Sequence, residues 1–527
     1  MIFAAPRLKL PMRIKADLCV VGSGAGGAPV ATLAAEAGLS VVVLEAGPFI
    51  PPEQMNQRET EMFPELLYAN GSQTNADRSL TIVQGRALGG STVHNINLCK
   101  RIPDAILSAW ARDGALEALP IEAWRGLYDE VEDLLSVSEI SAAERNLHNQ
   151  LLQKGIDALG WQGGALKHNR TGCIGSGFCE VGCAYDAKNN AVKVFLPRAV
   201  DAGADFLTQC RAVSVLHKNG QVIGIEAVAL DLFTRKPVGK ITIEAPRVCL
   251  AASATGTPAL MLRSRLPGPE EFIGNTLRVH PALVAAGRFD EPVRAWKGIP
   301  QSYECTEFLD FDAAHTARAR PDEGARHHQI AVEKPGQRSW IITAFAHPVA
   351  TATMLPGWGQ AHRELMEDYA HMAVFTSMVH DISAGRVRPD GDLGTKIHWW
   401  PDRADRRELV FGLARCAELL FAAGAREVII PSDSPRHLKP GDSLDWIEAL
   451  DPDPGDFGIT AVHPLGSVPM DDDPGRAAVD SRGRAHHIDG LWVADGSLFP
   501  TSIGVPPQLS IYAMGLHVAR AIIADAQ

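Results

Sequence analysis

The sequence predicts an α/β protein in which a doubly wound domain is divided between the two ends of the chain and an α+β domain is inserted into it. Residues 16–47 give the first signal, because a strand, a glycine-rich turn, a helix and a second strand follow one another there. Residues 491–524 repeat the order of strand, loop and helix near the other end. Between them, the stretch 274–457 changes to alternating strands and long loops. We therefore predict that residues 1–273 and 458–527 form the divided domain and that 274–457 form the insertion.

The glycine-rich turn follows the apolar run Ala16–Val21 and has the spacing G-x-G-x-x-G. Its three glycines are Gly22, Gly24 and Gly27. In this order they allow the sharp bend after the strand, the approach of a pyrophosphate to the backbone, and close packing of the helix on the sheet. The free N–H groups at the start of that helix can bind the diphosphate. Glu45 follows the second strand, where a carboxylate can accept hydrogen bonds from a ribose. The turn thus predicts a dinucleotide and leaves NAD and FAD both open.

The composition excludes several other classes of protein. With 46% apolar and 21% charged residues, the 527-residue chain is typical of a globular protein with substantial cores. A formal net charge of −12 argues against binding to nucleic acid, which requires a basic surface. No apolar run of about eighteen residues is present, and Pro6 and Pro11 interrupt the segment where a signal peptide would need an apolar core. We therefore expect a cytoplasmic protein without a transmembrane segment.

Local patterns place further elements. Residues 51–79 are expected to be irregular, whereas Thr81–Gln84 is expected to form a strand. That strand leads into a second glycine-rich loop, GRALGGSTVHN, at residues 85–95. In the insertion, helices are expected at about 361–379 and 405–423.

Several separated segments, taken in order, resemble the glucose–methanol–choline (GMC) flavin oxidoreductases over nearly the whole chain. They are VVGSGAGGAPVATLAAEAGLSVVVLEAG, GRALGGSTVHN, AASATGTPALMLRSR, AVHPLGSVPM and LWVADGSLFPTSIGVPPQLSI. The resemblance implies FAD as the dinucleotide, a mixed-sheet substrate domain, and oxidation of an alcohol by transfer of a hydride to flavin N5. The segment CIGSGFCEVGC and the ending are most similar to the long-chain-alcohol and sterol-oxidising branch. The expected substrate is therefore a fairly apolar or bulky alcohol, and the expected electron acceptor that reoxidises the flavin is oxygen or another compound.

The resemblance also places the catalytic residues. Oxidising an alcohol requires a group that removes the hydroxyl proton, and His463 occupies the active-site position of the family. An imidazole with a pKa of about 6.5 can accept that proton near neutral pH. Family members usually carry a second histidine or an asparagine where this chain has Pro506, which has no side-chain donor or acceptor. We therefore expect His463 to act as the general base, with Gln508 as a candidate donor to the substrate oxygen.

Candidate cofactor contacts follow from the same segments. Gly89 and Gly90 allow the loop to approach the flavin closely, and Asn95 can hydrogen-bond to it. His94 lies where some family members carry a histidine bonded to the flavin, so the FAD is expected to be either covalent through His94 or packed against it. Asp495 resembles the acid that contacts the ribityl chain, although it could also serve as a helix or turn cap. The other predicted cofactor-binding residues are Arg86, Ser91 and Val213.

Three cysteines form a local cluster with the spacing C-x₅-C-x₃-C. They are Cys173, Cys179 and Cys183. The pattern resembles the three-cysteine iron–sulfur segment of certain bacterial FAD sugar dehydrogenases. Three thiolates are fewer than the usual four ligands, however, and Ser176 stands where many of those proteins have another cysteine. A structural thiol loop near the flavin is therefore the favoured interpretation, with iron–sulfur ligation as the alternative.

Three other functions stay open at this level. A lyase on the same scaffold would keep FAD as a structural element and use His463 as an acid–base group. A sugar dehydrogenase would pass electrons through an iron–sulfur cluster at the three cysteines. A nicotinamide dehydrogenase would bind NAD at the glycine turn, and the colour of the purified protein would exclude it.

Overall fold

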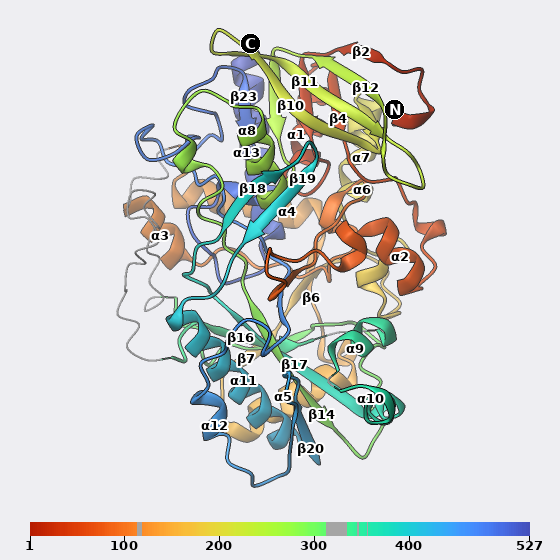
Figure 1. The fold of residues 1–527 in the computed structure, drawn as a ribbon, viewed down its shortest axis with the longest axis vertical. Coiled ribbons are helices and arrows are strands. Elements are labelled where there is room, and N and C mark those ends of the chain that lie inside the picture. Colours follow the sequence, from red (N-terminus) through yellow and green to blue (C-terminus); the bar gives the residue numbers. More distant parts are fainter. Residues whose placement is uncertain (113–117, 312–334, 345–346, 356) are drawn as a thin grey trace.

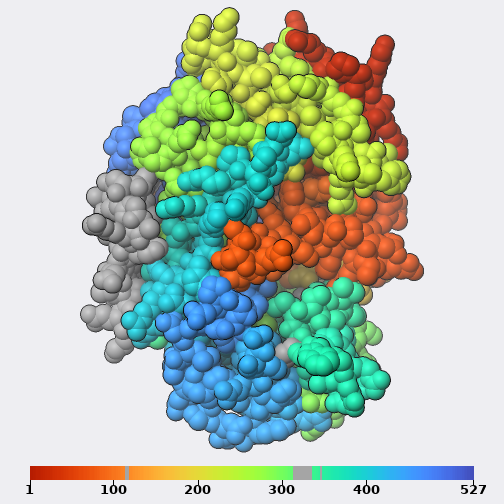
Figure 2. All heavy atoms as spheres, in the orientation of Figure 1, coloured from red at the N-terminus to blue at the C-terminus, as the bar shows by residue number. Residues whose placement is uncertain are grey.

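The computed structural model describes residues 1–112, 118–311, 335–344, 347–355 and 357–527. Two sheet-containing parts lie one above the other along the long axis (Figure 1). Residues that follow β4 (Val41–Leu44), orange in Figure 2, lie between the yellow-green upper part and the blue lower part. The chain ends are both in the upper part (Figure 1). The predicted α/β class with a discontinuous doubly wound domain is confirmed.

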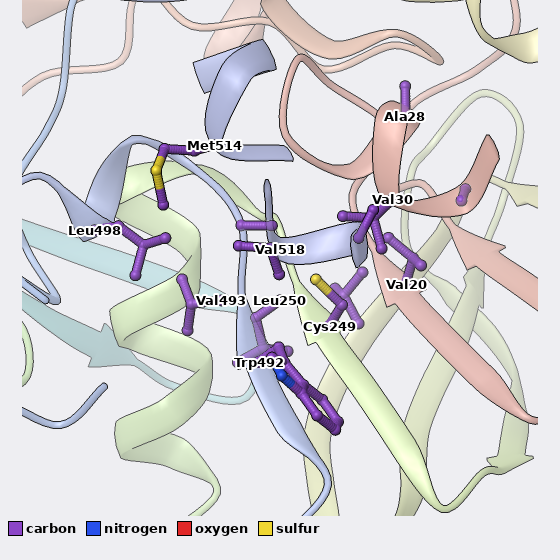
Figure 3. Packing of buried hydrophobic residues seen from close by; sticks show 14 of the residues in the cluster. Val20, Ala28, Val30, Cys249, Leu250, Trp492, Val493, Leu498, Met514 and Val518 are labelled. Atoms are coloured by element: carbon purple, nitrogen blue, oxygen red, sulfur yellow. The ribbon is translucent and has the colours of Figure 1, made fainter. Parts of the chain in front are cut away.

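A six-stranded parallel sheet forms the centre of the upper part. Its order is β1 (Ile2–Ala4), β9 (Asp205–Thr208), β4, β3 (Leu18–Val21), β13 (Arg247–Leu250) and β23 (Leu491–Val493). Strands β3 and β4 are buried at every position, which explains their runs of leucine and valine. Helices α1 (Gly27–Glu36) and α13 (Gln508–Ala526) pack against each other beside this sheet. Cys249, Trp492 and Val518 belong to the shared apolar core (Figure 3).

A second, four-stranded sheet covers the top of this part. Its order is β10 (Cys210–Lys218), β11 (Gln221–Leu230), β12 (Pro237–Glu244) and β2 (Met12–Lys15). The hairpin between β10 and β11 turns at Asn219 and Gly220, which both have positive φ. This pair is the usual signature of a tight hairpin turn.

The lower part is built on a nine-stranded mixed sheet. Its strands are, in order, β21 (Arg436–Leu438), β20 (Glu427–Ile430), β14 (Ala282–Arg288), β17 (Met372–Val379), β16 (Ser339–Thr343), β15 (Tyr303–Cys305) and β7 (Gly163–Ala165). In addition, β22 (Ile459–Ala461) pairs with β14, and β5 (Leu80–Ile82) pairs with β22. Helices α11 (Arg403–Ala423) and α5 (Leu147–Leu159) pack together on it. Strands β5 and β7 and helix α5 come from the predicted first part of the divided domain, and β22 comes from its last part. The two parts are therefore more interwoven than the predicted boundaries indicate.

Two local predictions differ from the structure. The helix expected at 361–379 ends early, since α10 covers only Gly359–Glu367 and β17 begins at Met372. Strand β17 lies between β14 and β16, and this pairing at the centre of the sheet outweighs any local preference for helix. Residues 51–79, expected to be irregular, contain helix α2 (Glu59–Leu66). The helix expected at 405–423 is confirmed as α11.

The remaining helices are α3 (Asp104–Arg112), α4 (Ile121–Leu134), α6 (Ala191–Val194), α7 (Leu196–Asp201), α8 (Ser253–Arg263), α9 (Pro348–Met354) and α12 (Asp445–Glu448). Two small antiparallel sheets of two strands pair β6 (Val137–Glu139) with β8 (Lys167–Asn169) and β18 (Arg386–Asp390) with β19 (Gly394–His398). Helix α13 is long and apolar enough to cross a membrane, but 56% of that stretch is buried within the protein. Its position against α1 and α4 is that of a core helix.

Candidate active site

A cavity of about 660 Å³ lies between the two parts and is lined by residues of both. The glycine turn, the end of β4 and the second glycine loop line it from the upper part. Alternate residues of β14 and β17 line it from the lower part. The cavity therefore joins the predicted dinucleotide site to the sheet of the inserted domain.

The glycines of the first turn divide into two groups by what a side chain would meet. A Cβ on Gly26 would lie 1.6 Å from the carbonyl oxygen of Ala494, so this residue is required by backbone packing. A Cβ on Gly24 would meet nothing closer than the Cα of Gly90 at 3.8 Å. Gly24 also lines the cavity, so the space beside it is available to a ligand. This is the geometry expected of the second glycine in a dinucleotide-binding turn.

Glu45 is buried and links the two glycine-rich loops through Ser23. Its carboxylate accepts hydrogen bonds from the Ser23 hydroxyl at 2.6 Å and from the Gly47 N–H at 2.9 Å. The Ser23 hydroxyl oxygen in turn accepts from the Gly89 N–H at 2.9 Å. Burial raises the pKa of Glu45, and the hydrogen bonds from Ser23 and Gly47 oppose that rise. Glu45 also lines the cavity, and its contact with a ribose stays a prediction.

The second glycine loop lies directly against the first. A Cβ on Gly90 would lie 3.0 Å from the Cα of Gly24, and the Ser91 hydroxyl oxygen accepts from the Gly85 N–H at 2.9 Å. Gly90, Ser91 and Asn95 line the cavity. The close backbone approach explains why this loop has no side chain at Gly90.

His94 presents a buried nitrogen that the protein leaves unsatisfied. Its Nε2 is inaccessible to solvent and has no hydrogen-bond partner in the part of the chain that the structure describes. Burial, together with the nearby charge of Lys188, lowers the pKa of His94 to about 3, so the ring is neutral. A buried nitrogen without a partner costs free energy unless a ligand satisfies it. With the glycine turns, this feature fits a flavin dinucleotide in the cavity.

Lys188 donates hydrogen bonds to the backbone of the second glycine loop. The sequence did not indicate this role. Its buried ammonium donates to the carbonyl oxygens of Val93 at 2.8 Å, Asn95 at 2.5 Å and Cys179 at 2.9 Å. It thereby joins the glycine loop to the cysteine loop. A lone lysine in a polar segment gives no local signal for such a role.

His463 lines the cavity and contacts a second histidine. Its Nδ1 lies 3.2 Å from Nδ1 of His280, which precedes β14 and is fully buried. Burial lowers the pKa of His463 to about 3. Nε2 of His463 has no hydrogen-bond partner within the described ranges, which leaves it available to a ligand. Both histidines stand in a Val-His-Pro tripeptide, and that shared sequence was the one signal that could have identified His280.

Gln508 lines the cavity, but its amide is engaged by the protein. Its Nε2 donates to the carbonyl oxygen of Leu98 at 2.7 Å and to the Oδ1 of Asn169 at 3.1 Å, and its Oε1 accepts from Asn95 Nδ2 at 2.7 Å. Both amide hydrogens are therefore used, so in this arrangement Gln508 has none to give to a substrate oxygen. Pro506 also lines the cavity, as expected without a polar side chain.

The other predicted cofactor residues are placed as follows. Asp495 lines the cavity and caps the turn that follows β23, since it accepts from the Ser497 N–H at 2.9 Å and from the Thr257 hydroxyl at 2.5 Å. Burial raises its pKa. Arg86 is buried in the electrostatic neighbourhood of Glu45 but does not line the cavity. Val213 does not line it either, although the preceding residues 210–212 do.

The three clustered cysteines do not converge on a metal-binding arrangement. Among the residues that the structure describes, no group of three or more His, Cys, Asp and Glu side chains could hold a metal ion. The sulfur of Cys173 accepts from the Gly175 N–H at 3.4 Å, and that of Cys183 from the Ala187 N–H at 3.3 Å. Backbone N–H groups donate to cysteine sulfur both in structural thiol loops and around iron–sulfur clusters, so both interpretations of this loop stay open.

One acidic side chain in the cavity wall was not expected. Glu180 lies next to Cys179 and lines the cavity. Burial raises the pKa of Glu180 to about 8, and the nearby Glu59 adds to the rise. Glu59 itself accepts from the Val349 and Ala350 N–H groups at the start of α9. At neutral pH the Glu180 carboxyl is therefore mainly protonated.

Replacing Glu180 by glutamine should remove a pH-dependent loss of stability. The carboxyl ionises at about 4.5 in the unfolded chain and at about 8 in the folded protein, so the unfolded chain loses the proton first. The free energy of unfolding should therefore fall as the pH rises from about 4.5 to about 8. E180Q should unfold at a higher temperature than the wild type, with a difference that grows across this range and then levels off. Thermal denaturation followed by circular dichroism measures it, and a difference independent of pH would contradict the assignment.

Comparison with known proteins agrees with this geometry. Two models of the GMC oxidoreductase family match the chain, the N-terminal model at residues 63–282 and the C-terminal model at 381–515. An uncharacterised GMC-type oxidoreductase of Mycobacterium tuberculosis is 33% identical over 522 residues, which cover 98% of this chain and 77% of that protein. A long-chain-alcohol oxidase of Arabidopsis thaliana is 28% identical, with 97% of this chain and 69% of that protein covered.

Solved structures share the fold. A pyridoxine 4-oxidase from Mesorbium loti superposes with a TM-score of 0.67 at 18% identity, covering 96% of this chain and 98% of that one. A variant of the Aspergillus oryzae formate oxidase gives a TM-score of 0.69 at 14% identity, with 98% and 99% covered. The glycine loops, the interwoven two-part fold and these matches over most of the chain lead to one assignment. The chain belongs to the GMC oxidoreductase family and is a flavin-dependent oxidoreductase.

Proposed function

We propose that this protein oxidises an apolar alcohol to the corresponding carbonyl compound, with FAD as hydride acceptor. One observation carries the proposal: a single cavity is lined at one place by His463 and, along the sheet of the inserted domain, by apolar side chains. A bound flavin would accept a hydride at N5. The chain itself would then bind the hydroxyl group at His463 and the hydrocarbon part against the sheet.

The apolar wall comes from alternate residues of two adjacent strands. Ala282, Val284 and Ala286 of β14 line the cavity, and so do Val374, Thr376 and Met378 of β17. The hydroxyl of Thr376 donates to the carbonyl oxygen of Leu283 at 3.1 Å, so the protein itself satisfies this one polar group. Alternate residues of a strand point to the same side, so these side chains form one surface. Ala282 is two residues from His280 and thus marks the end near the histidines, whereas Ala286 lies about 13 Å further along the strand. The wall is long enough to favour an extended hydrocarbon chain.

The relatives support this class of substrate. A long-chain-alcohol oxidase is among the proteins similar to this chain. The competing iron–sulfur sugar dehydrogenase would need a cluster at the cysteine loop, and analysis of the purified protein for iron and acid-labile sulfide tests it. A lyase remains the second candidate, and it differs in leaving the flavin oxidised.

The test is an anaerobic reduction screen with the FAD-loaded protein. Primary alcohols of increasing length, a sterol, a sugar and an aromatic alcohol are mixed with the enzyme, and the loss of oxidised-flavin absorbance is followed. We expect reduction by the apolar alcohols. Reduction by the sugar alone would reject the substrate class, and a flavin that stays oxidised with every alcohol would reject the oxidation. Repeating the active reactions in air shows whether oxygen reoxidises the flavin.

The same preparation tests the role of His94. Its unsatisfied Nε2 fits both a hydrogen bond to the flavin and a covalent bond to it. Acid precipitation separates the two, because covalently held FAD stays in the pellet and free FAD remains in solution. H94A should release all FAD to the solution in either case.

A larger side chain at position 286, at the end of the apolar wall farther from the histidines, should shift the substrate preference toward shorter alcohols. Ala286 is buried among apolar neighbours, and a phenylalanine there would fill the part of the cavity beside the end of β14 that is farther from His280. Each methylene group of the substrate that can no longer be buried against the wall costs about 0.8 kcal/mol of binding free energy, which lowers kcat/KM roughly fourfold. A286F should therefore lower kcat/KM progressively for longer alcohols and leave short ones unaffected. The matched variant A282F, near the histidines, should impair all lengths equally, and an equal loss in A286F would contradict this orientation.

A further inference from the structure

The cavity contains two adjacent histidines where the sequence predicts one catalytic base. The rings of His280 and His463 meet nearly at right angles, with an interplanar angle of 85°. Their facing nitrogens, both Nδ1, are 3.2 Å apart. Two neutral imidazoles at this distance share one hydrogen, so one ring donates and the other accepts. The hydrogen bonds made by the other ring nitrogen of His280, Nε2, determine which ring donates and which accepts.

Nε2 of His280 is held by two backbone donors. The N–H of Gly504 donates to it at 3.0 Å and the N–H of Ile503 at 3.3 Å. A ring nitrogen that accepts from an amide presents its lone pair and carries no hydrogen. Neutral His280 therefore carries its hydrogen on Nδ1 and donates it to His463. Because Nδ1 of His463 accepts, the hydrogen of neutral His463 lies on Nε2.

The surrounding structure holds His280 in this orientation. The carboxylate of Asp381 accepts from the backbone N–H of His280 at 3.1 Å and from the Ser502 hydroxyl at 2.8 Å. It thereby fixes the histidine relative to the segment that carries the two amides. The ring of His380 contacts the carbonyl oxygen of Ser502 at 3.1 Å on the same segment.

Both rings stay neutral in this environment. Burial is the main reason why the pKa of His280 is well below its ordinary range, and the neighbouring His463 and His380 lower it further. Burial raises the pKa of Asp381 to about 6, and the charge of Arg278 opposes this rise. A positive charge on either facing ring is therefore disfavoured, and the single shared hydrogen is the stable arrangement.

We propose that His280 is a positioning residue which fixes the tautomer of His463, so that the Nε2–H of His463 donates a hydrogen bond to the substrate oxygen. The contact with substrate rests on the alcohol oxidation proposed above, whereas the tautomer does not. A fixed donor at this place stabilises negative charge on the oxygen. The protonated Nε2 cannot also accept the hydroxyl proton. That proton therefore passes to solvent water in the cavity as the hydride leaves the carbon, and donation to the substrate oxygen replaces the role of general base inferred from residue type.

The tautomer can be measured directly in the FAD-loaded enzyme by ¹⁵N NMR with labelled histidine. We expect Nδ1 of His463 and Nε2 of His280 to resonate as unprotonated nitrogens, and the other nitrogen of each ring as protonated, from about pH 6 to 9. H463Q and H280Q identify the two sets of signals. An unprotonated Nε2 on His463 would overturn the proposal, whether or not the enzyme oxidises alcohols. A negative alcohol screen with the expected tautomer would reject the function and keep the tautomer.

Two matched substitutions test the effect on the reaction. Glutamine at position 280 can accept from the amides and still donate to His463, whereas glutamate ionised there can only accept. H280Q should keep the rate of anaerobic flavin reduction within about tenfold of the wild type. H280E should invert the tautomer and lower the rate by about 10²- to 10³-fold at equal FAD content. An H280E enzyme as fast as H280Q would overturn the proposal, and if neither variant binds FAD, the wild-type NMR measurement decides.

Discussion

Replacing His463 by alanine should lower the rate of anaerobic flavin reduction by about 10³-fold while the FAD content stays unchanged. Loss of one preorganised donor to the reacting oxygen costs about 10²- to 10³-fold in rate. The side chain touches His280 and the cavity, and it makes no hydrogen bond to the glycine loops that the structure describes. Stopped-flow mixing with the best alcohol found in the screen measures the effect.

Two further variants give this experiment its controls. H463Q keeps an N–H donor but has no basic nitrogen, so it should recover at least part of the activity that H463A loses. H398A changes an exposed histidine on β19 and should leave the rate unchanged. If H463A reduces the flavin at nearly the wild-type rate, the hydroxyl group is bound elsewhere and the proposed site is wrong.

Substituting alanine for Gly24 should weaken FAD binding by more than tenfold without destabilising the protein. The new methyl group would have no protein atom closer than 3.8 Å, so the fold has room for it. It would project where the backbone is expected to meet the diphosphate. Flavin content after purification and the Kd of FAD for the stripped protein measure the loss, together with the thermal midpoint of the flavin-free form.

Substitutions at two other glycines, Gly26 and Gly126, serve as controls for this prediction. G26A would drive its methyl group to 1.6 Å from the Ala494 oxygen, so it should destabilise the protein itself. G126A, on the exposed face of α4 with no atom within 4 Å, should leave FAD binding unchanged and should raise stability slightly, because alanine favours a helix more than glycine does. Normal FAD binding by G24A would show that the dinucleotide does not approach this turn.

The parts of the fold that the sequence predicts well are those with local causes. The strand, glycine turn and helix at residues 16–47 are specified by adjacent residues, and α11 is specified by its helical pattern. The exchange of β5, β7 and β22 into the lower sheet has no such signal, because each strand is three residues long and pairs with a distant segment. Likewise, β17 was mistaken for helix because its central place in the sheet depends on β14 and β16.

The same distinction applies to the site. His463 could be located from its segment, and its residue type suggested a base. The position of its hydrogen could not be inferred from sequence, because that depends on His280 and on two backbone amides at 503 and 504. Gln508 was expected to donate to the substrate oxygen, but its amide is engaged by Leu98, Asn95 and Asn169, which come from other parts of the chain. Local motifs thus identify which residues line the cavity, whereas tertiary contacts determine what each can donate or accept.

The pairing of β5 with β22 also bears on how the protein is made. Leu80 lies beside Ile459 in the lower sheet, and β13 beside β23 in the upper one. A chain synthesised from its N-terminus therefore cannot complete either sheet until residues beyond 459 and 491 have left the ribosome. Contacts between such distant segments also slow folding, since long loops must close before they form. The protein should consequently acquire its stable structure late, as a single unit, and the isolated segment 274–457 should not fold alone.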